Sequence, residues 1–186
     1  MSNILTVPTF ELKAFLTLSK GKSTALSKPR TCYSPCGRCL LVDISGKRVQ
    51  LTHTNQIWLV RRTSYDFDVT RAAEGHYVLD LAAIAALDLS LRNKLTALDL
   101  DGLRATFVAE DYLKGIDFSN LCEKHKQGKH VDGSTFDLGY LQAVTRYFKD
   151  AKCPLVNVTY PQKAFEPIQW EYGGYNYNGL LMPIRR

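Results

Sequence analysis

The clearest hydrophobic pattern in the chain lies between residues 134 and 158. Apolar side chains there recur at intervals of three and four residues, namely Leu138, Leu141, Val144 and Phe148. Ser134 is a natural N-cap after an Asp–Gly turn. Pro154 interrupts the helical pattern, and a β-rich run from Leu155 to Val158 follows it. This stretch predicts a turn, an amphipathic helix and then a strand.

Other patterns predict the elements that precede this unit. Thr9 can cap a first short helix with an apolar stripe. Residues 39–44 and 48–53 are apolar runs around a short loop that contains Gly46, which predicts a β-hairpin. Two more strands are expected at 57–60 and 76–79. Asp80 is expected to cap a helix, and the leucine-rich segment 91–98 is expected to continue the helical region.

The rest of the chain completes an α+β prediction. Residues 103–108 follow an Asp–Gly turn and read as another strand, and no internal repeat is visible. We expect a single domain over 1–186, with a mixed β-sheet and a few packed helices. Within it, residues 1–30 would be a helix plus a mobile basic connector, and residues 31–186 would be the α+β core.

Composition limits the class of protein. The 186 residues are 45% hydrophobic and 23% charged, as in ordinary globular proteins. No apolar run approaches the roughly 18–20 residues that a membrane span needs. The N-terminal residues lack a basic segment followed by an apolar one, so no secretory signal is expected. Five cysteines without an export signal favour reduced thiols. We therefore expect a cytoplasmic protein with no membrane span.

The charge is basic and unevenly distributed. The net charge is +6 and the pI about 9.1, which favours an anionic partner such as nucleic acid or an acidic protein. Lysine and arginine dominate residues 1–30 and 47–71, whereas carboxylates dominate residues 72–118. This distribution predicts one basic and one acidic face, although charge runs are often only solvated surface.

The start of the predicted helix at Ser134 is a candidate phosphate site. Unpaired amide groups and partial positive charge at a helix N-terminus favour anions. The residues proposed to bind a phosphate or nucleotide are Lys129, His130, Gly133, Ser134 and Thr135. The alternative is that Ser134 only caps a core helix.

The order of features over residues 129–160 resembles the last third of the ParB/sulfiredoxin-like fold. Asp132 and Gly133 match the Asp–Gly turn of that superfamily, whereas Ser134, Thr135 and Phe136 stand where histidine and arginine are expected. Within the superfamily, the size and basic charge resemble the plasmid fertility-inhibition proteins, which include the oncogenic-suppression type.

This resemblance implies a function and its partners. The chain would be a mobile-element-encoded protein that interferes with conjugative DNA transfer by binding DNA or the conjugation coupling and secretion machinery. The resemblance also implies weak nucleotide-hydrolysing or DNase activity, with Mg and ATP as the candidate cofactors. Asp132 would then be the catalytic, metal-binding carboxylate.

Two groups of residues are candidates for nucleic-acid contact. Arg61 and Arg62 end the third predicted strand and form a compact set of donors. The glycine-rich tail offers aromatic rings and cations that can stack on bases, namely Trp170, Tyr175, Arg185 and Arg186. Alternatively, the arginines mark an exposed strand end, and the tail forms a final hairpin or a protein-binding surface.

Three cysteines carry the remaining candidate chemistry. Cys32, Cys36 and Cys39 have the spacing C-x3-C-x2-C, which resembles the iron–sulfur motif of radical S-adenosylmethionine enzymes. Zinc is a second option, with His53 or His76 as a fourth ligand. The alternative is a turn with reduced thiols in which Cys39 begins a strand. Whether the chain is an enzyme stays open: it is a metal- or cluster-dependent enzyme, a DNA-binding protein, or a protein–protein interaction module without catalysis.

Overall fold

The computed structural model describes residues 3–19, 35–55, 58–90, 93–108, 138–153, 155–159, 166–173 and 176–182. The strands are β1 (Ile4–Pro8), β2 (Cys39–Ser45), β3 (Arg48–Thr54), β4 (Trp58–Ser64), β5 (Asp68–Arg71), β6 (Gly75–Asp80), β7 (Leu95–Asp99), β8 (Asn157–Thr159), β9 (Ile168–Tyr172) and β10 (Tyr177–Leu181). The helices are α1 (Thr9–Ser19), the 3-10 helix η1 (Pro35–Arg38), α2 (Leu81–Ala85) and α5 (Leu138–Asp150). No helix of these described segments is long and apolar enough to cross a membrane.

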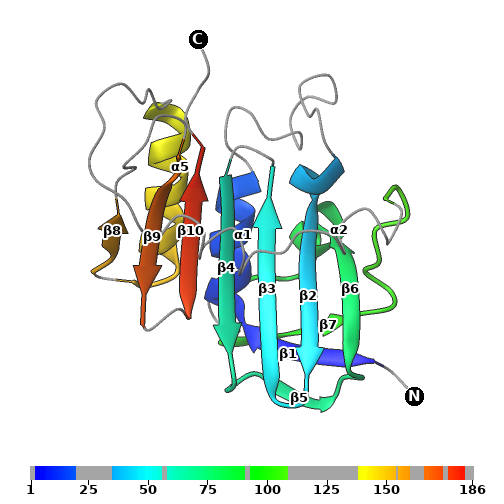
Figure 1. Ribbon diagram of the computed structural model, residues 1–186. Helices are drawn as coiled ribbons and strands as arrows, with labels where there is room; N and C mark the ends of the chain where they lie inside the picture. The colour runs from blue at the N-terminus through cyan, green and yellow to red at the C-terminus, as the bar shows by residue number, and fades with distance from the viewer. Residues whose placement is uncertain are drawn as a thin grey trace.

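The strands form two sheets. The larger has seven strands in the order β6-β2-β3-β4-β10-β9-β8, and the smaller has three in the order β5-β1-β7. Every strand pairing within the described segments is antiparallel. Figure 1 shows α1, α2 and α5 behind the larger sheet, while β1 runs across its lower end. The core lies between these layers.

Local sequence explains the first hairpin. Only Gly46 and Lys47 separate β2 from β3, and Ser45 pairs with Arg48. Gly46 has a φ of 56°, the left-handed conformation that tight hairpin turns require and that glycine adopts without steric cost. This hairpin confirms the prediction from residues 39–53.

The helix-facing side of the large sheet is mostly apolar, with His53 and Arg62 among its polar exceptions. One row of cross-strand neighbours contains Val158, Trp170, Gly179, Val60 and His53. A side chain at Gly179 would place its Cβ 3.0 Å from Cε2 of Phe148, so α5 packs directly on β10. The outermost strand β8 is less covered, since all three of its residues are exposed, whereas Ile168 and Trp170 of β9 are buried.

The described elements repeat in their order. Apart from the short η1, the series β1–α1–β2–β3–β4 contains the same kinds of element in the same order as the series β7–α5–β8–β9–β10: a strand, a helix and three strands. Equivalent elements contact each other: β1 pairs with β7, β4 pairs with β10, and α1 packs on α5. The two series are therefore related by an approximate twofold axis. The sequence itself shows no internal repeat, so this repetition is visible only in the order and pairing of the described elements.

The structure corrects the predicted fold class. A ParB/sulfiredoxin-like mixed sheet is wrong, because the described strands form two antiparallel sheets with the topology given above. The predicted helix and strand after residue 134 do exist, as α5 and β8. A helix followed by a proline and a strand occurs in many folds, so this local match could not identify one.

Two local predictions are also wrong. Residues 95–99 are strand β7 and not a continued helix; Thr96 and Leu98 are buried while their neighbours are exposed. Leucines three or four residues apart fit a helix, but this two-residue alternation is that of a strand. Residues 103–108 form turns, with a single β-bridge between Arg104 and Leu79. Asp80 does cap α2, since its carboxylate accepts the amide of Ala82 at 2.8 Å.

Candidate nucleic-acid interface

Helices α1 and α5 form an antiparallel pair on the large sheet. The rings of Phe15 and Tyr147 lie 5.1 Å apart in their interface. Lys152, just after α5, reaches back to the start of α1, where its Nζ lies 4.5 Å from the ring centre of Phe10. The buried stripe of α5 consists of Val144, Tyr147, Phe148 and, just beyond its end, Ala151. The outer side of the pair faces solvent: α5 is exposed there, whereas the outer residues of α1, namely Phe10, Lys13 and Thr17, are only half-buried.

That solvent side is basic. It carries the side chains that we call the basic helix face: Lys13, Arg146, Lys149 and Lys152. Lys13 is half-buried and the other three are exposed. The sequences of α1 and α5 contain two carboxylates, Glu11 and Asp150, and Glu11 is buried. A surface with four cations and so little opposing charge attracts a polyanion.

A buried ion pair holds this helix pair to the sheet. Glu11 of α1 is 1% exposed, and its Oε1 accepts from Nε of Arg62 in β4 at 2.9 Å. The hydroxyl of Tyr177 in β10 donates to the same oxygen at 2.7 Å. The guanidinium of Arg62 also stacks on the Tyr177 ring, 4.3 Å from its centre. These contacts join α1, β4 and β10 near the approximate twofold axis.

Burial dominates the titration of this cluster. Desolvation raises the pKa of Glu11, although the Tyr177 hydrogen bond and the Arg62 charge oppose the shift. Desolvation also raises the pKa of the Tyr147 hydroxyl well above its usual value, and the pKa of Cys153 to about 12. The thiol of Cys153 is therefore protonated at neutral pH and is a poor nucleophile.

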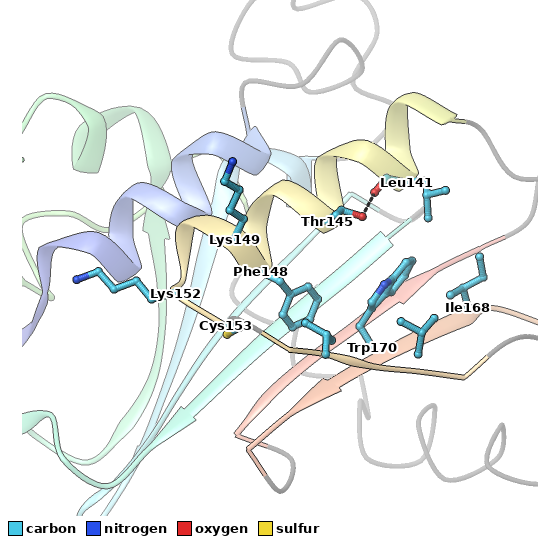
Figure 2. A pocket seen from close by; sticks show the side chains of 10 residues that line it. Leu141, Thr145, Phe148, Lys149, Lys152, Cys153, Ile168 and Trp170 are labelled. Atoms are coloured by element: carbon cyan, nitrogen blue, oxygen red, sulfur yellow. Dashed lines mark hydrogen bonds between the residues drawn. The ribbon is translucent and has the colours of Figure 1, made fainter.

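Beside the basic helix face, an apolar groove opens between α5 and the outer strands. It has a volume of about 760 Å³. Its lining residues are Leu141, Thr145, Phe148, Lys149, Lys152, Cys153, Val156, Val158, Ile168 and Trp170. Figure 2 shows Phe148, Ile168 and Trp170 toward the groove floor, whereas the amines of Lys149 and Lys152 point away from it. The groove has no carboxylate among these lining residues.

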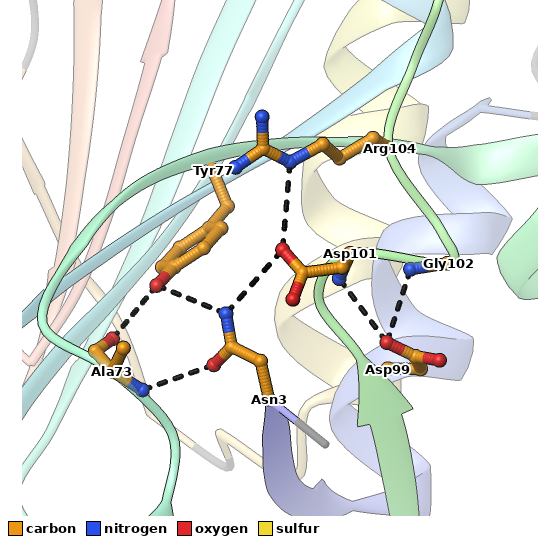
Figure 3. Close-up of polar contacts among 7 residues, drawn as sticks. All are labelled: Asn3, Ala73, Tyr77, Asp99, Asp101, Gly102 and Arg104. Atoms are coloured by element: carbon orange, nitrogen blue, oxygen red, sulfur yellow. Dashed lines mark hydrogen bonds and ion pairs between the residues drawn. The ribbon is translucent and has the colours of Figure 1, made fainter. Parts of the chain in front are cut away.

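The end of the molecule formed by the small sheet is acidic. Exposed carboxylates lie on or beside β5 and β7: Asp66, Asp68, Glu74, Asp88, Asp99 and Asp101. Figure 3 shows how Asn3 organises part of this end: its Nδ2 donates to Tyr77 Oη at 3.2 Å, and its Oδ1 accepts the Ala73 amide at 2.9 Å. This end repels a polyanion, which favours the basic helix face as the side that meets one.

The structure separates the two arginines that the sequence groups together. Adjacent strand residues point to opposite faces of a sheet. Arg62 lies on the helix side and is engaged with Glu11, and its side chain is 14% exposed. Arg61 lies on the other side, where its Nε donates to the hydroxyl of Thr52 at 3.1 Å. The two therefore do not form one cluster of donors.

Trp170, another predicted nucleic-acid residue, lies in β9, which pairs with β10. These strands form a final hairpin, one of the alternatives for the tail. Trp170 is 6% exposed and lies in the wall of the groove. Tyr175, Arg185 and Arg186 lie outside the described residues. The same holds for the whole predicted phosphate site, namely Lys129, His130, Asp132, Gly133, Ser134 and Thr135. The roles given to these residues stay predictions.

The structure places part of the cysteine motif. Cys39 begins β2, as one alternative predicted, and it is buried. Cys36 lies in η1, and Cys32 is outside the described residues. Nδ1 of the buried His53 lies 2.9 Å from the carbonyl oxygen of Cys39, and desolvation lowers the pKa of His53 to about 4. Within the described segments, no three histidine, cysteine or acidic residues gather in a way that could hold a metal ion.

Comparison with solved structures identifies the fold. The chain is similar to the DNA polymerase III beta subunit of Thermotoga maritima, with a TM-score of 0.63 and 15% identity over 98% of this chain. It is also similar to the DNA polymerase sliding clamp of Bacillus subtilis, with a TM-score of 0.57 and 11% identity over the full chain. The beta subunit of Streptococcus pyogenes gives a TM-score of 0.53 and 13% identity. The fold is thus the sliding-clamp type.

The likeness is structural and covers part of those proteins. The chain spans 65% of the length of the Thermotoga and Bacillus structures. No protein-family model matches the sequence, and no curated protein matches it either. The prediction that the chain resembles ParB/sulfiredoxin-like proteins is wrong, because the solved structures that it matches consistently have the sliding-clamp fold.

Proposed function

We propose that this chain is a clamp-like DNA-associated protein that binds duplex DNA through the basic helix face. Lys13, Arg146, Lys149 and Lys152 would contact phosphate groups and not base edges, so binding would depend little on sequence. The observation that carries the proposal is the placement of these four cations on one side of the α1–α5 pair.

Two further observations support it. The solved structures with the same fold are named as a DNA polymerase sliding clamp and as polymerase beta subunits. The acidic residues gather on the small sheet, which leaves a charge contrast between that end and the helix pair. Both the fold and the charge therefore favour a DNA partner, which is one of the anionic partners that the net charge of +6 favours.

Interference with conjugative transfer is not part of this proposal. That function and the expected Mg, ATP and conjugation-machinery partners came from the resemblance to fertility-inhibition proteins, and the fold does not support that resemblance. A cysteine-bound iron–sulfur cluster or zinc ion stays a separate prediction, tested by metal analysis of the purified protein.

Salt dependence tests the proposal. With four phosphate contacts, the logarithm of the binding constant should fall with the logarithm of the salt concentration with a slope of about −3 to −4. Duplex affinity should therefore fall on the order of a hundredfold between 50 and 200 mM salt. The measurement is fluorescence anisotropy of a labelled duplex, repeated with an unrelated duplex sequence. The proposal predicts the same slope for both duplexes. Absence of binding at 50 mM salt, or binding that salt does not weaken, would contradict it.

A further inference from the structure

We propose that the groove beside α5 and the open edge of β8 together bind an extended segment of another protein. The segment would be apolar at alternate positions and acidic at the end that lies near the C-terminus of α5. This inference does not depend on DNA binding, and its surface shares only Lys149 and Lys152 with the basic helix face. It rests on three features of the described residues.

The first feature is an open sheet edge. Within the described segments, β8 pairs with β9 alone and is the last strand of the seven-stranded sheet. All three of its residues are exposed. An edge strand presents alternate backbone N–H and C=O groups to solvent, and these can pair with an added strand.

The second feature is the apolar surface beside that edge. Val158 of β8 is 40% exposed and lines the groove together with Val156, two residues earlier. Leu155, just before them, is 80% exposed. In a strand added beside β8, every second side chain would point to the helix side of the sheet, next to Val158. Those side chains would enter the groove between the strand and Leu141 of α5.

The third feature is charge. Lys149 and Lys152 both lie toward the C-terminal end of α5, and no carboxylate lines the groove. Their stems line it while their amines reach solvent, where long side chains can move to meet an anion. β8 begins at the same end, because only a few residues separate it from Lys152. An antiparallel partner strand would therefore carry its acidic residues in its C-terminal half.

These features favour a peptide over a nucleotide or a second copy of the chain. A bound base needs hydrogen-bonding partners, yet the one hydroxyl of the groove, in Thr145, already donates to the carbonyl of Leu141 at 2.8 Å. A second copy could bring its own β8 against this edge, which the light-scattering test below addresses, or against the other edge strand, β6. The central residues of β6 already exchange hydrogen bonds with the 103–105 segment, such as Ala105 N to Val78 O at 2.9 Å.

The test uses a labelled eight-residue peptide in which valine and threonine alternate over five positions and three aspartates follow. The matched controls are the peptide with three lysines instead, and the peptide with the aspartates placed first. We expect anisotropy to show binding of the first peptide to the full chain, with at least tenfold weaker binding of the lysine version. We expect the version with the aspartates first to bind more weakly as well.

Variants locate the site. Val158→Asp should weaken peptide binding at least about tenfold, since it puts a charge where an apolar side chain is covered. Leu95→Asp makes the same kind of change at another exposed strand residue and should leave binding unchanged. Lys149→Glu with Lys152→Glu should weaken binding about fivefold, and Lys47→Glu with Arg48→Glu should not. All four side chains are exposed.

Three results would overturn the inference. One is that none of the three peptides binds the folded protein. Another is that the lysine peptide binds as tightly as the aspartate peptide. The third is that the chain self-associates in light scattering and becomes monomeric on Val158→Asp, which would make a second copy the occupant of this edge.

Discussion

Replacing Arg62 with methionine should lower the free energy of unfolding by about 3–5 kcal/mol. The change removes the countercharge of Glu11, which is 1% exposed and cannot turn to solvent without moving α1. Leaving one charge of a buried pair without its partner typically costs this much. Because small proteins have only about 5–15 kcal/mol of stability, the variant should be close to unfolding.

The pH dependence separates lost charge from lost packing. The pKa of Glu11 in the folded state is raised above 4.5, so the folded protein holds this proton more tightly than the unfolded chain. The stability contributed by Glu11 is therefore complete below pH 4.5 and is lost as pH rises through the higher folded pKa. Without Arg62, that pKa rises further. The loss in the free energy of unfolding caused by Arg62→Met, relative to the wild type, should thus be large at pH 7.5 and smaller at pH 4.5.

Urea unfolding of the wild type and the variant at both pH values measures this deficit. A matched control is the double variant Glu11→Leu, Arg62→Met, which replaces the ion pair by apolar groups and should recover most of the stability at pH 7.5. An equal deficit at both pH values would mean that Arg62 acts through packing on Tyr177 and not through the charge of Glu11.

Reversing the charge of three side chains in the basic helix face should abolish duplex binding. The variant carries Lys13→Glu, Arg146→Glu and Lys149→Glu, three positions on the solvent side of α1 and α5. Each lost phosphate contact reduces the salt slope by about 0.9, and the new carboxylates repel the duplex. We expect at least a hundredfold loss of affinity at 50 mM salt. None of the three side chains is part of the buried core, so the fold should persist.

The control for this variant has the same net charge. Lys47→Glu, Arg48→Glu and Arg71→Glu also convert three cations into anions, at exposed positions outside the helix pair. Both triple variants lower the net charge from +6 to 0. If the two variants lose affinity equally, overall charge drives binding and the basic helix face is not a specific interface. Anisotropy of one labelled duplex compares them.

Local structure can be predicted where the pattern of apolar and polar positions along the chain is clear. The hairpin of β2 and β3 follows from two apolar runs around Gly46, and α5 follows from the spacing of Val144 and Phe148. The prediction failed at β7, because the spacing of Leu95 and Leu98 also fits a helix. Tertiary pairing with β1 decided the strand conformation there, and that pairing joins segments almost a hundred residues apart.

The candidate site was predictable only in part. The polar side of α5 contains Arg146 and Lys149, so its basic character is readable from the helical period. The role of Arg62 could not be predicted, because its partner Glu11 lies 51 positions earlier and the sequence does not show that the two residues meet. The pairing of β4 with β10, which brings Tyr177 to the same carboxylate, is a long-range contact of the same kind.

Photo-crosslinking of the protein to a duplex with photoreactive groups next to its phosphates, followed by mass spectrometry, tests DNA binding most directly. If duplex DNA lies on the basic helix face, crosslinks will form in the peptides that contain residues 9–19 and 138–153. Crosslinks on β3, β4 or the small sheet, with the helix peptides unmodified, would contradict the assignment of that face.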